Sequence, residues 1–456
     1  MYDVVVIGGG PGGYAAAIRA AQLGGKVALV EADLLGGTCV NRGCIPTKVW
    51  SAAARSILAV QQMSELGIQA RIEKTDFDLI VARKNGVAND IRTGMGALLA
   101  NNGVEVVNGR AVFENAREIR VGKTLLEAEK VIIATGARTE TPDVPGLTDA
   151  LLSFDQLFDL TKLPDSVLIC GDGHVEVELA FILRCFGVNV HLVGESSRIL
   201  PFADHDSSQR LTHELKKCDL ELTMRAKLAA VERSGQGFCC RLNSQEAQTI
   251  NTDRVIFAPR VPNSRNLELE KAGVTVDEIG GIQVNDYLET SSSGIYAIGD
   301  VLGGIMQSHA ASAMAVTAAE NAMGKHKQFR FQLIPKTCWT IPELGSVGLT
   351  EDEAEEQGYD LDIGEFPYAI NGLSMTSNQP AGSVKIIKET RDGEILWVHI
   401  VGPNATELTG EAVLAIQMEC TAEELAASIR AHPTFSEAVV DAARDAENWA
   451  LYLPRR

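Results

Sequence analysis

Short apolar runs that end in glycine-rich turns recur along the chain. The first run, VVVIGGGPGG, passes into an alanine-rich segment at residues 14–23, which predicts a strand, a tight turn and a helix. A second strand is predicted at residues 26–30 and ends at Glu31. The same order returns in SVLICGDGHVEVELA, which precedes a predicted strand at residues 189–193. Two βαβ units, about 160 residues apart, therefore each predict the start of a dinucleotide-binding sheet.

The other apolar runs predict how these units are joined and followed. VIIATGA at residues 131–137 predicts a strand that enters a tight turn, and two prolines within residues 141–145 predict a hinge. GIYAIGD at residues 294–300 repeats the pattern of strand and turn. Beyond about residue 331, short strands such as SVKIIK and LWVHIVG alternate with amphipathic helices at residues 411–418 and 424–429. We expect an α/β fold in which two Rossmann-like domains accompany a separate α+β domain.

Length and composition agree with this fold class. A chain of 456 residues is too long for one hydrophobic core and predicts about three domains. Hydrophobic residues make up 45% and aromatic residues 5%, so we expect an aliphatic core, which suits parallel sheets covered by helices. The net charge of −19 disfavours nucleic acid as a partner, because its phosphates need clustered cations. The first residues lack a signal-peptide pattern and no apolar run approaches ~20 residues, so we expect a cytoplasmic protein that does not span a membrane.

The nine cysteines are too few and too scattered for a disulfide scaffold, and their odd number leaves at least one unpaired thiol. Most of them are predicted to be ordinary core residues, and they lack partners at zinc-binding spacing, so no metal site is expected. This group consists of Cys170, Cys185, Cys218, Cys239, Cys240, Cys338 and Cys420. Cys39 and Cys44 are the exception, because they lie close together beside the first βαβ unit.

The first glycine loop has the full context of a dinucleotide site. Gly8, Gly10 and Gly13 fit G-x-G-x-x-G, with a predicted strand before them and a predicted helix after them. The glycines allow a tight turn, close approach of a pyrophosphate and close packing of the helix on the strand. Glu31 follows at the end of the next strand and is expected to hold a ribose hydroxyl. A glycine-rich turn without a ligand is the alternative interpretation.

The cysteine pair lies in GGTCVNRGCIPTK, residues 36–48, directly after the strand that ends at Glu31. If Cys39 and Cys44 lie where a helix begins, their separation brings them round about one and a half turns, within bridging distance after a slight distortion. A helix N-terminus would also favour the thiolate. These features suggest an exchangeable disulfide, since a zinc site would need two further ligands nearby.

This segment resembles the active-site signature of the flavin-dependent pyridine nucleotide disulfide oxidoreductases. The resemblance covers nearly the whole chain and includes, in order, VIIATGA, GIYAIGD, PELGSVGLTEDEA, VHIVGPNATEL and AHPTFSE. Within the family, the motifs are most similar to those of dihydrolipoamide dehydrogenases. The resemblance implies FAD and NAD as cofactors and a homodimer. It also implies an FAD-binding domain at residues 1–146, completed by about 272–335, an NAD-binding domain at 147–271 and a C-terminal α+β dimerisation domain at 336–456.

The resemblance also implies roles for single residues. Cys44 is expected to face the flavin as a thiolate, and Cys39 to exchange with the substrate sulfur. Lys48 is expected beside the N5 edge of the flavin, paired with Glu178 from the second unit. Asp300 is expected to bind the ribityl chain of FAD. The residues expected to complete the flavin site are Gly37, Thr38, Ala111, Thr135, Gly136, Met306, Gln307, Ser308 and His309.

The segment AHPTFSE contains His432 and Glu437, and Pro433 prevents a helix from continuing through it. A disulfide exchange needs a group that moves a proton near neutral pH, and a histidine oriented by a carboxylate meets this need. Taken alone, such a pair is more often a plain surface feature. The resemblance implies that His432 is the base, that Glu437 orients it, and that the pair reaches the disulfide of the other subunit.

The implied reaction is oxidation of a protein-bound dihydrolipoyl group, with electrons passing through the disulfide and FAD to NAD. The expected partner is a lipoylated carrier protein or domain. Relatives that relay electrons through extra C-terminal cysteines are disfavoured, because no cysteine follows Cys420. NADPH is disfavoured because GESSRILP offers only Arg198 for its extra phosphate. A reductase for another disulfide or acceptor is the alternative.

The second βαβ unit departs from the family pattern at three positions. Glu176 stands where the third glycine is expected, Gly194 replaces an acid at the end of the strand, and Pro259 replaces a glycine. The bulk and charge of Glu176 oppose a dinucleotide, although an outward rotamer and a ribose contact from Glu195 would restore the site. Weakened NAD binding, ordinary NAD binding and a non-catalytic flavoprotein all stay open. The candidate NAD-binding residues are Gly171, Gly173, His174, Glu178, Glu195 and Leu228.

Overall fold

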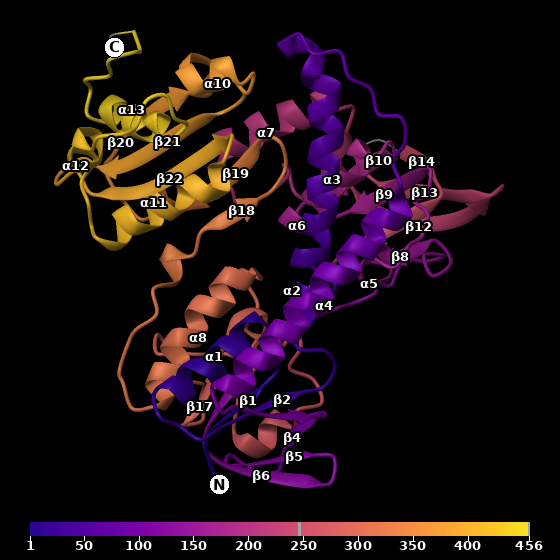
Figure 1. Cartoon of the computed structure of the whole chain (residues 1–456), viewed down its shortest axis with the longest axis vertical. Helices are drawn as coiled ribbons and strands as arrows, with labels where there is room; N and C mark the ends of the chain where they lie inside the picture. Colours follow the sequence, from indigo (N-terminus) through magenta and orange to yellow (C-terminus); the bar gives the residue numbers. More distant parts are fainter. Residues whose placement is uncertain (245–247, 455–456) are drawn as a thin grey trace.

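The computed structural model describes residues 1–244 and 248–454. Its first sheet, in the lower part of Figure 1, has the order β3-β2-β1-β6-β5-β4, with β17 paired to β6. The strands are β1 (Tyr2–Ile7), β2 (Val27–Glu31), β3 (Glu105–Asn108), β4 (Ala111–Phe113), β5 (Glu118–Val121), β6 (Thr124–Ile133) and β17 (Ile295–Ala297). Because β17 is distant in sequence from the other strands, two separate segments of the chain build this sheet.

The centre of the first sheet is parallel and buried. Val5 pairs with Ala28 on one side and with Val131 on the other, and all three are fully buried. A strand that is covered on both faces needs a continuous apolar run, which explains the sequence VVVI. Helices α1 (Pro11–Gln22) and α8 (Ser308–Ala322) pack together over one face, where their many alanines allow a close approach.

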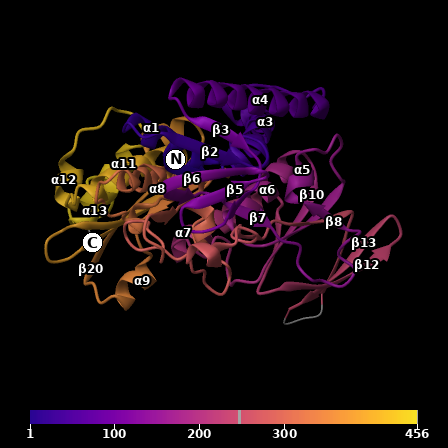
Figure 2. The ribbon, with the colours of Figure 1, turned by 90° about the horizontal axis from the view of Figure 1, so that it is seen from below.

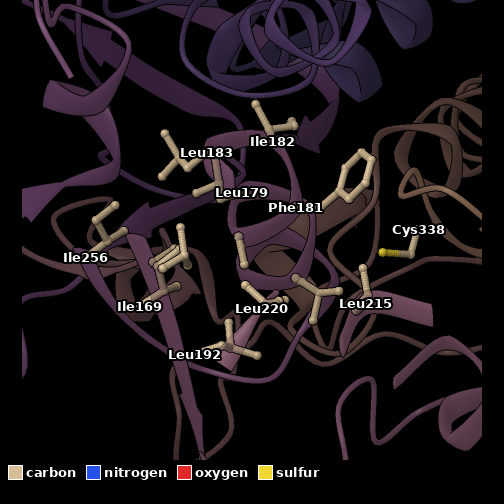
Figure 3. Close-up of a cluster of buried hydrophobic side chains, with 14 of the residues drawn as sticks. Ile169, Leu179, Phe181, Ile182, Leu183, Leu192, Leu215, Leu220, Ile256 and Cys338 are labelled. Carbon is tan, nitrogen blue, oxygen red and sulfur yellow. The ribbon is translucent and has the colours of Figure 1, made fainter. Parts of the chain in front are cut away.

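A second, fully parallel sheet has the order β11-β10-β9-β15-β8. Its elements are β8 (Leu151–Ser153), β9 (Ser166–Cys170), β10 (Asn189–Gly194), β11 (Glu221–Met224) and β15 (Arg254–Phe257), with α5 (Phe154–Leu157), α6 (His174–Cys185) and α7 (His205–Lys217). An antiparallel sheet of β12 (Lys227–Ser234), β13 (Gly237–Asn243) and β14 (Gln248–Thr252) lies beside it. Figure 3 shows the core of this region, where Leu179 and Leu183 of α6 lie toward Ile169 and Ile256 of the sheet. Phe181 of the same helix lies on the other side, nearer to Cys338.

The third sheet, at the upper left of Figure 1, is antiparallel. It has the order β18 (Lys336–Cys338), β19 (Glu343–Val347), β22 (Ile395–Gly402), β21 (Ser383–Glu389) and β20 (Leu361–Pro367). Helices α11 (Ala405–Gln417), α12 (Ala422–Ala427) and α13 (Glu437–Ala446) share its core. The predicted strands SVKIIK and LWVHIVG fall in β21 and β22. The structure thus confirms the predicted fold class, two Rossmann-like sheets with a C-terminal α+β region.

Three helices begin earlier than the sequence pattern predicts. Helix α1 begins at Pro11 instead of residue 14, because proline suits the first helical position and the loop glycines after it are already helical. Helix α11 begins six residues before the predicted segment, at Ala405. Helix α12 begins at Ala422 because Thr421 and Glu424 form a capping box, and it ends at Ala427 instead of residue 429.

Two long helices connect the first sheet with the second. Helix α3 (Cys44–Gln62) and helix α4 (Phe77–Asn101) pack side by side along the edge of the molecule that is uppermost in Figure 2. Trp50 of α3 is fully buried in the core of the second sheet, with edge-to-face contacts to Phe77 and Phe158. This packing fixes the start of α3, and therefore Cys44, relative to both sheets. Within the described part of the chain, no helix combines the length and apolar character needed to cross a membrane.

Candidate active site

A cavity of about 680 Å³ opens where parallel strands of the first sheet end, the edge at which open α/β sheets bind ligands. Nearly all residues predicted for the flavin line it. These are Gly8, Gly10, Glu31, Gly37, Thr38, Lys48, Ala111, Thr135, Gly136, Asp300, Met306, Gln307, Ser308 and His309. Gly13 does not line the cavity but packs directly against Gly8.

The glycine loop at one end of this cavity leaves no room for a side chain at Gly8 or Gly13. Gly8 has a φ of +105°, and a Cβ there would lie 2.3 Å from the carbonyl oxygen of Ala134. A Cβ on Gly13 would lie 1.7 Å from the carbonyl oxygen of Gly8. The N–H of Gly9 donates to Oε2 of Glu31 at 2.6 Å, so a carboxylate stands beside the loop. This cradle at the start of α1 fits the pyrophosphate and ribose of a dinucleotide.

The two candidate redox cysteines line the same cavity from consecutive helices. Cys39 lies within α2 (Gly37–Asn41), and Cys44 is the first residue of α3. The structure holds both as thiols. A hydrogen bond from Cys39 lowers the pKa of Cys44 to about 6. Burial raises this pKa, whereas Ser308 and Lys48 lower it further. The bond to Cys44 and burial raise the pKa of Cys39. Cys44 is therefore the sulfur that carries negative charge near neutral pH.

A hydroxyl group contacts the sulfur that begins α3. Oγ of Ser308 lies 3.0 Å from Sγ of Cys44, although the two residues are 264 positions apart in sequence. Ser308 is the first residue of α8, so the N-termini of α3 and α8 both meet at this sulfur. A hydroxyl donates to a thiolate more strongly than to a neutral thiol, so this contact stabilises the charged form of Cys44.

Lys48 projects from α3 toward the second domain. Its Nζ lies 2.6 Å from Oε2 of Glu178 on α6, which is the pair that the family resemblance implies. The other oxygen of Glu178 accepts from the backbone N–H of Trp339 at 3.0 Å. The Lys48 ammonium also lies 4.0 Å from the centre of the Trp339 ring, a cation–π distance. These contacts hold the ammonium at the wall of the cavity.

Asp300, the residue expected to bind the ribityl chain, forms an ion pair in this structure. Its Oδ2 lies 2.9 Å from Nη2 of Arg260, in β16 (Arg260–Pro262), which pairs with β7 (Ala137–Thr139). Burial raises the pKa of Asp300, and the Arg260 charge opposes that rise. Burial also lowers the pKa of His174, which lines the same cavity. No group of three metal-ligating side chains occurs among the described residues.

A second cavity of about 490 Å³ lies at the corresponding edge of the second sheet. Of the predicted NAD-binding residues, four line it, and His174 and Glu178 line the first cavity instead. The four are Gly171, Gly173, Glu195 and Leu228. Ala258 and Arg260 line both cavities, so the two spaces adjoin. The three departures from the family pattern also lie around this space. Glu176 and Pro259 line it, and a Cβ on Gly194 would lie 2.8 Å from Cβ of Asp172, which lines it as well.

The predicted base and its carboxylate are paired, but they lie apart from the cysteines. Nδ1 of His432 is 2.8 Å from Oε1 of Glu437, whose other oxygen accepts from the N–H of Thr434 at 2.7 Å. Neither residue lines either cavity, and the His432 side chain is 77% exposed. A histidine that is held at one nitrogen and exposed at the other is available to a second molecule.

Sequence comparison places this geometry in a family. The family described as pyridine nucleotide-disulphide oxidoreductase matches residues 2–315, and its dimerisation domain matches residues 334–443. The chain belongs to the pyridine nucleotide-disulphide oxidoreductases, which confirms the family that the sequence motifs indicated. A pyridine nucleotide and a disulfide, which the family's description names, agree with the two adjoining cavities and the cysteine pair.

Within the family, dihydrolipoyl dehydrogenases are similar to this chain over its whole length. The dihydrolipoyl dehydrogenase of Thermus scotoductus is 38% identical over 100% of this chain and 99% of its own. That of Bacillus subtilis is 34% identical over 99% of each chain. These relatives support the predicted enzyme class, a dihydrolipoamide dehydrogenase-like oxidoreductase.

Solved structures show the same architecture. LpdA of Mycobacterium tuberculosis superposes with a TM-score of 0.89 at 26% identity, covering 97% of this chain and 98% of its own. The HOCl-induced flavoprotein disulfide reductase RclA of Escherichia coli superposes with a TM-score of 0.84 at 27% identity, covering 96% of this chain and 99% of its own. The flavoprotein named here agrees with the predicted flavin, so a flavin and a pyridine nucleotide are the cofactor classes of this fold.

Sequence reasoning missed several contacts at the site. Ser308 was expected only as one of the residues that complete the flavin site, whereas its hydroxyl also contacts Cys44. Trp339 and Arg260 carried no motif that marked them, yet they contact Lys48 and Asp300. Arg260 directly follows Pro259, one of the three departures from the family pattern, and this position was the signal in the sequence that could have drawn attention to it.

Proposed function

We propose that this protein oxidises protein-bound dihydrolipoyl groups and passes the electrons to NAD. The observation that carries the proposal is the position of the thiols: Cys39 and Cys44 line a glycine-cradled cavity, and Cys44 begins a helix. The full-length similarity to dihydrolipoyl dehydrogenases supports the choice of substrate. FAD in the first cavity, when bound, supplies the two-electron link between the cysteine pair and the nicotinamide.

In this proposal Cys39 and Cys44 form a disulfide in the oxidised enzyme. One substrate thiolate attacks Sγ of Cys39, which forms a mixed disulfide and releases Cys44 as a thiolate. The second substrate thiol then attacks the substrate sulfur of the mixed disulfide. This step releases Cys39 and yields the lipoyl disulfide and the reduced cysteine pair. The contacts from Ser308 and the start of α3 stabilise the released thiolate of Cys44.

The proton of the substrate thiol needs an acceptor, and His432 is the proposed base. Glu437 holds Nδ1 of His432, which leaves Nε2 for the substrate. Because His432 lines neither cavity of its own chain, we propose that it serves the cysteine pair of a second copy in a homodimer. The matched dimerisation domain, which includes His432, supports this arrangement.

The same proposal assigns the parts of the chain. Residues 1–146, completed by about 272–335, hold FAD, residues 147–271 hold NAD, and residues 336–456 form the subunit interface. The return of β17 to the first sheet supports the split flavin domain. The nine scattered cysteines, which are too few for a disulfide scaffold, support a reducing, cytoplasmic compartment.

A steady-state assay tests the function directly. The purified, flavin-loaded protein is expected to reduce NAD with dihydrolipoamide as the electron donor. It is expected to show little turnover with NADPH and glutathione disulfide. A preference for the second pair of substrates, or a protein that binds no added flavin, would overturn the proposal.

A second candidate is a flavin disulfide reductase that uses an acceptor other than NAD. The position of Glu176 at the second cavity favours this alternative, since a carboxylate there opposes a dinucleotide. Under this alternative, dihydrolipoamide reduces the bound flavin under anaerobic conditions, whereas an excess of NADH does not. Reduction by both reagents supports the NAD-dependent enzyme.

A further inference from the structure

The second glycine loop is covered by a side chain of its own helix. Glu176 lies in the first turn of α6 and is only 9% exposed. A Cβ on Gly171 would lie 2.7 Å from Cγ of Glu176, and a Cβ on Gly173 would lie 2.9 Å from Oε2. The side chain therefore folds back across both glycines instead of pointing outward.

The carboxylate of Glu176 lies among the groups that a dinucleotide phosphate would use. Its Oε2 lies beside Gly173, the residue that precedes α6, where the free backbone N–H groups of a helix N-terminus attract anions. The cavity of about 490 Å³ lies beside it and is lined by the same loop. An anion supplied by the chain thus occupies the anion-binding end of α6.

The charged groups around Glu176 compensate its charge only in part, through Arg260. Asp172, in the same loop, is a further carboxylate, held by the N–H of Ser196 at 2.9 Å. Of the two cations that line the cavity, Lys227 on β12 lies 3.6 Å from Glu195, which follows β10, and Arg260 on β16 pairs with Asp300. From β9, the thiol of Cys170 completes the set of titratable groups that face this space.

We propose that Glu176 is an internal substitute for the dinucleotide phosphate, so that the second cavity binds a nicotinamide dinucleotide only when this side chain is neutral or displaced. The proposal makes Glu176 the residue that sets dinucleotide affinity. It rests on the proposed function in that it takes the ligand of this cavity to be NAD or NADH.

The protonation of Glu176 gives the proposal a pH signature. Burial raises the pKa of this carboxyl to about 7, with Asp172 adding to the rise and backbone hydrogen bonds opposing it. The carboxyl is therefore mostly neutral at pH 6 and mostly charged at pH 8. A ligand that binds only the neutral form should lose about tenfold in affinity over that interval.

A purely structural role makes a different prediction. An acid in the first turn of a helix stabilises it through the helix dipole, whether or not a ligand binds nearby. In that case replacement of Glu176 would lower the unfolding temperature and leave the affinity for NAD unchanged.

The test is calorimetric titration of the flavin-loaded protein with NAD, which cannot reduce the oxidised flavin, at pH 6 and pH 8. The Glu176→Gln variant keeps the shape and removes the charge, so it should bind NAD equally at both pH values. The Glu176→Gly variant also uncovers the loop and should bind at least about tenfold more tightly than the wild type at pH 8. The control is Glu232→Gln, which removes one negative charge from an exposed position on β12 and should behave as the wild type.

Wild-type affinity that does not change between pH 6 and 8, or a Gln variant with the same pH dependence as the wild type, would overturn the proposal. The Gln variant keeps the test open if the Gly variant does not fold. Reduction of the flavin by dihydrolipoamide, followed in the same preparations, reports on the first cavity and the cysteine pair. Failure of that reduction would count against the proposed function and not against the role of Glu176.

Discussion

The two βαβ units of this protein have the same fold but carry very different residues at the third position of the helix that follows the glycine loop. The third residue of α1 is Gly13, and the third residue of α6 is Glu176. In the first unit a Cβ at this position would lie 1.7 Å from a backbone oxygen. In the second unit a whole side chain fits, because it folds over Gly171 and Gly173 into the space beside the loop.

This difference separates what a Rossmann-like fold requires from what its ligand requires. Both units keep a buried parallel strand before the loop and a glycine of positive φ at its first position, Gly8 and Gly171. The fold therefore needs the tight turn. The open anion site at the helix N-terminus depends on the later residues of the motif, and only the first unit retains it.

The strongest test of the comparison transplants the second unit's residue into the first. The variant Gly13→Glu should lose its flavin entirely, because even the Cβ overlaps the carbonyl oxygen of Gly8. The ratio of flavin to protein absorbance measures the effect, and circular dichroism checks the fold. Gly86→Glu is the matched control, since Gly86 lies within α4 with open space around it and should leave the flavin bound. A yellow Gly13→Glu protein would show that the loop is more adaptable than its geometry indicates.

The next-largest effect is expected on turnover, when the cysteine pair in the first cavity is broken. Replacement of Cys44 by serine should lower turnover of dihydrolipoamide by about a thousandfold or more, because the hydroxyl cannot take part in disulfide exchange. Flavin content should not change. Cys218→Ser, at the end of α7, removes a thiol far from either cavity and should keep full turnover. Wild-type turnover of the Cys44 variant would exclude a disulfide mechanism.

A smaller effect on turnover is expected when the proposed base, His432, is replaced. The variant His432→Gln should lower turnover about a hundredfold, which is within the usual range for loss of general base catalysis. NADH binding to the second cavity should be unaltered. Mixing this variant with Cys44→Ser subunits should restore part of the activity in mixed dimers, because one intact site forms between the two chains. No recovery on subunit exchange would contradict a base supplied by the partner.

The smallest effect is a shift in the titration of one thiol. Replacement of Ser308 by alanine removes a hydroxyl that stabilises the charged form, so the pKa of Cys44 should rise from about 6 by about one pH unit. The pH dependence of thiolate absorbance or of alkylation in the reduced protein measures this shift. Ser308→Thr keeps the hydroxyl and should titrate as the wild type. An unchanged midpoint in the alanine variant would mean that Cys39, Lys48 and the helix terminus set this pKa without the hydroxyl.

Much of the fold was predictable because local signals agree with the tertiary arrangement. The run VVVI is apolar at every position because β1 is buried on both faces, and this pattern predicts a central parallel strand. The starts of α1 and α12 were misplaced because they depend on Pro11 and on the capping box at Thr421, which lie outside the periodic pattern. The cysteine pair, the glycine loop and Glu31 were found from their spacing, because their neighbours in sequence are also their neighbours in space.

The sequence by itself determined that two glycine loops exist, that two cysteines accompany the first, and that a glutamate interrupts the second. Only the tertiary structure decided that Ser308 meets Cys44 and that Trp339 meets Lys48. It also decided that the carboxylate of Glu176 turns toward its own loop. Spacing along a chain specifies which backbone segments form, but a side chain's rotamer and its distant partners depend on how separate elements pack, and local periodicity carries no record of that packing.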